Sequence, residues 1–118
     1  MIKFLILVSF LGSVLSCANE SIESVKAFGT KEFSSNEWKS SDIKTKSEML
    51  YSFLKNNDIH KMNDNDIHKL LGKSTAYYEY DEFPAYNVVL NGKEYIIAFP
   101  INRETNRIRK YVFEPKLK

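Results

Sequence analysis

The hydrophobic and polar positions of this chain form four consecutive patterns. Phe4 to Leu15 is an almost unbroken apolar run, whereas residues 18–39 are polar, serine-rich and without a steady period. Residues 42–71 place apolar side chains at the spacing of helices, and the residues after Gly72 alternate between apolar and polar, as strands do. The pattern therefore predicts helices followed by strands, in an α+β domain.

The helical part of the pattern predicts two helices. The first covers residues 42–56 and has Ser40 or Ser41 as its cap. We expect one face of this helix to be core, and that face comprises Ile43, Ser47, Met49, Leu50, Phe53 and Leu54. The second helix is short, with Asn63 as its cap and Gly72 as a left-handed exit.

The alternating part of the pattern predicts an antiparallel meander of three to four strands, with the two helices packed on one face. A tyrosine-rich strand is expected over residues 76–80 and a last strand over residues 107–114. Between them, residues 85–90 and 93–99 flank Asn91-Gly92, the strongest short hairpin signal. A two-residue loop fixes the register, which pairs Leu90 with Lys93, Val88 with Tyr95 and Tyr86 with Ile97.

The start of the chain has the features of a secretory signal. Lys3 precedes the apolar run, which is about a dozen residues long, whereas a membrane-spanning helix needs roughly 20. Small residues gather before Cys17, the only cysteine of the chain. We expect residues 1–16 to be a signal peptide, residues 17–39 to be a flexible tether and residues 40–118 to be the single domain.

The tetrapeptide Val14-Leu15-Ser16-Cys17 resembles the lipobox of bacterial lipoproteins. The resemblance implies that Cys17 carries a diacylglyceryl group and acyl chains such as palmitate, which anchor the protein in a membrane. Ala18 follows the cysteine where an aspartate would imply retention in the inner membrane, so the expected location is the outer membrane, facing the periplasm. A plain secretory signal or a buried structural thiol is the alternative interpretation of Cys17.

Charge argues against two classes of partner. Removal of residues 1–16 takes away one lysine and leaves 16 basic side chains against 15 acidic ones. This balance predicts neither nucleic-acid binding nor electrostatic attachment to lipid.

The sequence contains no recognisable catalytic or cofactor-binding motif, so we expect a protein that is not an enzyme, with no cofactor and no small-molecule substrate. It has no glycine-rich phosphate loop and no nucleophile elbow. His60 and His68 lie beside acids in a near repeat, but no third metal ligand has a recognisable spacing, and His68 is expected on the solvent face of its helix. We therefore predict no metal site.

Beyond the anchor, the chain resembles small envelope proteins of the BamE/SmpA-like group. The residues that carry this resemblance are Trp38, Lys46 to Met49, Leu54, Met62 to Asp66, Leu70-Leu71-Gly72, the tyrosine-rich segment and the final hairpin. Lys46 stands where that group usually has arginine, and Lys73-Ser74 replaces its acid-proline pair. The resemblance implies a helix-helix-sheet fold shared with beta-lactamase inhibitor protein repeats, and a role in envelope assembly or maintenance.

These observations together predict a lipid-anchored protein that binds another envelope protein through its sheet or the ends of its strands. Tyrosine is favoured in protein interfaces, so Tyr77, Tyr78, Tyr80 and the adjacent Phe83 are the candidate contact residues. Ordinary half-buried strand tyrosines are the structural alternative. An immunity or inhibitor lipoprotein that neutralises a periplasmic toxin or enzyme is the alternative function.

Overall fold

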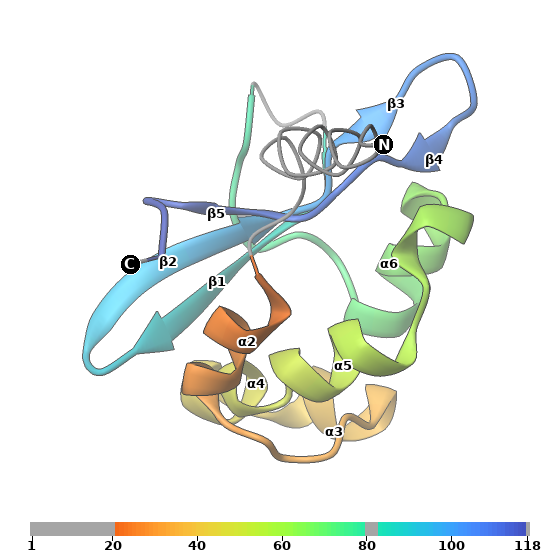
Figure 1. Ribbon diagram of the computed structural model, residues 1–118. Coiled ribbons are helices and arrows are strands. Elements are labelled where there is room, and N and C mark those ends of the chain that lie inside the picture. Colours follow the sequence, from red (N-terminus) through yellow and green to blue (C-terminus); the bar gives the residue numbers. More distant parts are fainter. Residues whose placement is uncertain (1–20, 80–82, 118) are drawn as a thin grey trace, which may run out of the picture.

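The protein is an α+β domain in which helices cover one face of a small antiparallel sheet (Figure 1). The computed structural model describes residues 21–79 and 83–117. The helical half comprises α2 (Ile22–Val25), η1 (Lys26–Phe28), α3 (Ser35–Ser40), α4 (Ile43–Glu48), α5 (Leu50–Asn56), η2 (Ile59–Lys61) and α6 (Asp64–Leu71). The strands are β1 (Ala85–Leu90), β2 (Lys93–Ala98), β3 (Ile101–Asn102), β4 (Arg107–Ile108) and β5 (Val112–Glu114). The predicted fold class is confirmed.

The central hairpin has the predicted register. Leu90 is opposite Lys93, Val88 opposite Tyr95 and Tyr86 opposite Ile97. Asn91 and Gly92 both have positive φ, at 52° and 79°, as the tight two-residue turn requires. On one face of the hairpin, Leu90 is partly buried, and the side chains that form the core beneath the sheet are Tyr86, Val88, Tyr95, Ile97 and Phe99.

The C-terminal part of the chain forms two short pairings rather than the single strand predicted over residues 107–114. β5 pairs with β2, while β3 and β4 pair with each other in a separate two-stranded sheet. The turn of this second sheet is built around Asn102, whose side-chain oxygen accepts the N–H groups of Glu104 at 2.8 Å and Thr105 at 3.3 Å. Local hydrogen bonds of the asparagine side chain therefore favour a turn here, and the alternation of apolar and polar residues did not predict the short strands around it.

The predicted first helix is divided into α4 and α5 at Met49. The Glu48 carbonyl, next to this break, accepts a hydrogen bond from the distant Lys31 N–H at 3.1 Å. Asp42 caps α4 by accepting the Thr45 N–H at 2.9 Å, so the predicted cap at Ser40 or Ser41 is wrong. α6, by contrast, has the predicted cap, because Asn63 and Asp66 form a reciprocal capping box.

The prediction of a flexible tether over residues 17–39 is wrong for the part of that segment that the structure describes. Residues 21–40 form α2, η1 and α3, and they bury Val25, Phe28 and Trp38 in the core. The Phe28 ring stacks on Phe113 with centroids 5.5 Å apart, so this segment packs directly against the sheet. Aromatic side chains far from any periodic pattern therefore fix the segment to the domain by long-range burial.

The strand predicted for the tyrosine-rich segment is wrong, because residues 76–79 do not form a strand. Instead, the N–H groups of Thr75 and Ala76 both donate to the Ala85 carbonyl, at 2.9 and 3.2 Å. Glu79 has a positive φ of 53°, which interrupts an extended chain. Within the described residues no helix has the length and apolar character needed to cross a membrane.

Candidate functional site

The segment after α6 lies along the outer edge of β1, where hydroxyl and amide groups hold its backbone. Gly72 ends the helix at φ +83° and turns the chain toward the strand. Thr75 Oγ1 accepts the Asn87 N–H at 2.9 Å, and the Asn87 side-chain amide donates to the Thr75 carbonyl at 2.9 Å. Together with the Ala85 bonds, these contacts fix the position of residues 74–76 without burying their side chains in the core.

Ser74 and His68 form a polar pair beside this segment. Ser74 Oγ accepts the Ala85 N–H at 3.1 Å and lies 3.5 Å from His68 Nε2. Among the described residues no carboxylate hydrogen-bonds His68, so the orienting acid of a catalytic triad has no counterpart there. His68 is exposed, as predicted, and no group of three metal-ligating side chains occurs in the described part of the chain.

A cavity of about 700 Å³ opens at this segment. It is lined by His68, Lys73, Ser74, Thr75, Ala76, Tyr77 and Phe83. Tyr77 is 73% exposed, which makes it the most exposed of the large hydrophobic side chains that the structure describes. Phe83, by contrast, is only 8% exposed, and the Arg103 guanidinium lies over its ring at 5.5 Å from the centroid. The cavity thus combines an accessible aromatic rim with a packed aromatic wall.

The sequence-predicted contact residues therefore have different environments. Tyr77 projects at the rim of the cavity, while the Tyr78 ring lies 6.3 Å from Phe83 and is partly buried. Burial raises the pKa of the Tyr78 hydroxyl, and the nearby carboxylates of Glu79 and Glu114 add to the shift. Tyr80 and Cys17 lie outside the described residues.

A second cavity, of about 180 Å³, adjoins the first and was not predicted from the sequence. Its lining residues are Trp38, Ile43, Lys46, Thr75, Tyr86 and Asn87. The Trp38 indole N–H donates to the Leu71 carbonyl at 2.9 Å, and the Tyr86 hydroxyl donates to the Gly72 carbonyl at 2.7 Å. Burial raises the pKa of Tyr86, so this hydroxyl keeps its proton for that bond. The aromatic walls of the cavity are therefore held in place by the C-terminal end of α6.

Ile43 lies at the mouth of the second cavity rather than in the core. Periodicity placed it on the buried face of a long helix, but Ile43 is 37% exposed, whereas Leu50 is fully buried. Ile43 is the first residue of α4, and α4 and α5 are separate helices rather than the single predicted one. Lys46, one turn after Ile43, places its ammonium 5.8 Å from the centre of the Trp38 ring. The sequence signal that could have identified this site is the Ile43–Lys46 spacing next to a lone tryptophan.

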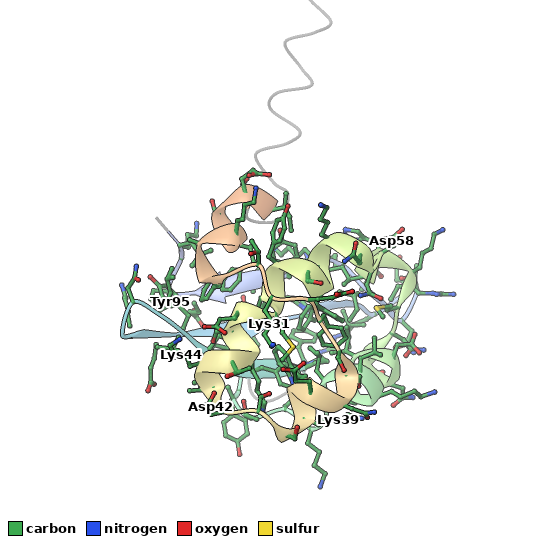
Figure 2. The ribbon with its side chains drawn as sticks, turned by 90° about the horizontal axis from the view of Figure 1, so that it is seen from below. Lys31, Lys39, Asp42, Lys44, Asp58 and Tyr95 are labelled. Carbon is green, nitrogen blue, oxygen red and sulfur yellow. The ribbon has the colours of Figure 1, made fainter. Side chains whose placement is uncertain are left out.

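Both cavities share Thr75 as a lining residue, so we treat them as one concave region, the Thr75 surface, defined by the lining residues of the two cavities. Ile43 and Tyr77 are the exposed large hydrophobic side chains of the described residues, and each lines one of the two cavities. The lining residues include two lysines and no carboxylate. Figure 2 shows the helical face of the domain. Lys39 of α3, Asp42, which caps α4, and Lys44 of α4 lie on this side of the molecule.

Comparisons with protein-family models, with known proteins and with solved structures found no match to this chain. The resemblance to the BamE/SmpA-like group therefore stays a prediction, and the function has to be argued from the surface itself.

Proposed function

We propose that this protein is a lipid-anchored lipoprotein of the bacterial envelope whose domain binds another envelope protein without catalysing a reaction. The observation that carries the proposal is Tyr77, an aromatic side chain left 73% exposed beside a cavity of about 700 Å³. The lipobox-like residues up to Cys17 support the anchor.

The position of Tyr77 suits a binding contact because its backbone neighbours are already fixed. Thr75 and Ala76 are hydrogen-bonded to Ala85, so little conformational freedom is lost there when a partner binds. Truncating a tyrosine that anchors an interface typically weakens binding by about 2 kcal/mol or more. Tyr77 is 73% exposed and lines the cavity, and tyrosine is a residue type enriched in protein interfaces.

The test of binding is affinity capture of the full chain, extracted from membranes in mild detergent, with captured proteins identified by mass. Tyr77→Ser is expected to abolish capture of the partner while chemical denaturation stays within about 0.5 kcal/mol of wild type. His60→Ser, at another exposed position, is the matched control and should capture normally. Equal capture by wild type and Tyr77→Ser would contradict the proposed surface.

The test of the anchor is Cys17→Ser. We expect this variant to leave the membrane fraction or to keep its signal peptide, because the acylated sulfur is lost. Normal processing with unchanged membrane retention would overturn the anchor. The identity of the captured protein separates the roles, since a toxin or enzyme would favour the inhibitory alternative over envelope assembly.

A further inference from the structure

We infer that the partner presents an acidic protein surface with two apolar side chains, which the Thr75 surface binds through its two cavities at once. This inference rests on the proposed function and names the chemistry of the partner. It has three supports on this surface: the apolar anchors, the cations and the concave shape.

The apolar anchors are paired. Ile43 and Tyr77 come from segments 34 residues apart in the chain, yet each lines one of two cavities that meet at Thr75. Exposed apolar side chains scattered singly need no explanation, but two that converge on one concave region indicate an interaction site. Binding at both points buries both side chains and fills both cavities.

Among the described residues, the lysines are the charged side chains that line this surface. Lys46 and Lys73 line it, and neither forms an ion pair within the described part of the chain. Three other lysines, Lys26, Lys31 and Lys44, do have carboxylate partners. Asp42, the carboxylate next to Ile43, caps α4 by accepting the Thr45 N–H and does not line either cavity. Complementary charge on a partner would therefore be negative.

The shape and the number of cations favour a protein over a membrane. Recognition of anionic lipid typically uses clusters of about four to eight lysines or arginines. Here only two lysines border two cavities, and the anchor side chains of protein interfaces are bound in pockets. Polar rims with a few desolvated anchors are typical of protein interfaces.

The position of Lys46 beside Trp38 adds specificity. Its ammonium is held over the Trp38 ring at 5.8 Å, and Trp38 is fixed by its bond to Leu71. A contact with this ring favours one position of the ammonium, so the position of a partner carboxylate matters as well as its sign.

The experiment places a photo-reactive phenylalanine analogue at Ile43 or at Tyr77 of the full chain in its own cells. Crosslinked proteins are identified by mass, and the attached peptides are sequenced. We expect the same protein at both positions, with attached peptides rich in aspartate and glutamate. We also expect the yield to fall when salt is raised, because exposed charges are screened.

Charge reversal sharpens this experiment. The double variant Lys46→Glu, Lys73→Glu should lower the crosslink yield from Tyr77 at least about tenfold. The matched control is Lys55→Glu, Lys93→Glu, which removes the same charge and also two lysine–aromatic contacts, to Tyr51 at 5.6 Å and Tyr95 at 5.3 Å. The control should stay within about twofold of wild type, and thermal unfolding should confirm that both double variants fold.

The outcomes separate this inference from the proposed function. A protein crosslinked at both positions, but with neutral or basic attached peptides, or with a yield insensitive to salt, overturns the acidic partner and leaves protein binding intact. Different proteins at the two positions overturn the two-cavity arrangement. Lipid adducts alone, or no protein at either position, overturn both proposals.

Discussion

Two segments of this domain are attached to it in opposite ways. Residues 21–40 are held by side chains, since Val25, Phe28 and Trp38 are buried in the core. Residues 73–79 are held mainly by polar bonds to β1, and Tyr77, the more exposed of their two tyrosines, projects into solvent. The difference means that the core side chains of the first segment and the proposed contact residue Tyr77 are separate, so Tyr77 can be changed without removing a core side chain.

The largest expected effect is on the first segment. Trp38→Ala should lower the free energy of unfolding by about 3–5 kcal/mol, because it removes a fully buried indole and leaves the Leu71 carbonyl without its donor. Chemical denaturation measures the loss. Lys39→Ala, at the exposed neighbouring position, should stay within about 0.5 kcal/mol. Equal effects would mean that the segment is a tether after all.

The next effect concerns the backbone of the same segment. Gly29 has φ +138°, and a Cβ there would lie 3.0 Å from the Glu48 Cα. Gly29→Ala should therefore cost about 1–3 kcal/mol, through strain and a displaced contact with α4. Gly92→Ala is the control, since Gly92 also has positive φ but has open space around it. A loss at Gly92 as large as that at Gly29 would exclude the close approach as the cause.

A smaller effect is expected in the second segment. Thr75→Val keeps the side-chain shape but removes the hydroxyl that accepts the Asn87 N–H, so we expect a loss of about 1 kcal/mol. Thr75→Ser retains the acceptor and should recover most of that loss. If valine and serine behave alike in thermal unfolding, the hydroxyl bond does not hold this segment.

The smallest effect on stability is expected at Tyr77. Tyr77→Ser removes a ring that is 73% exposed, so the free energy of unfolding should change by no more than about 0.5 kcal/mol. Tyr78→Ser should cost more, because that ring is partly buried near Phe83. Denaturation curves that rank the two tyrosines in the reverse order would place the core contact at Tyr77.

The parts of the fold that could be predicted are those with strong local signals. Asn91-Gly92 determines the hairpin register, and Asn63 with Asp66 determines the start of α6. Trp38 gave no such signal, because its burial depends on α6 and Tyr86, which are distant in sequence. The tyrosine pattern mispredicted a strand, since the backbone N–H groups of Ala85 and Asn87 at the edge of β1 donate to the hydroxyls of Ser74 and Thr75 instead.

The candidate site was half predictable for the same reason. Tyr77 was identified by its residue type next to a turn. Ile43 was assigned to the core because its spacing fitted one long helix, but the structure has two helices, and the Glu48 carbonyl at the end of the first accepts a hydrogen bond from Lys31. A site assembled from α4, the end of α6 and the edge of β1 has no contiguous sequence signature.

The early start of the folded domain limits how far it can extend from a membrane. With Cys17 acylated as proposed, four peptide units separate the anchor from Ser21, and α2 begins at the next residue. Even a fully extended chain of that length spans only about 14 Å. The domain would therefore lie close to the bilayer surface, and it would bind a partner there rather than at a distance across the periplasm.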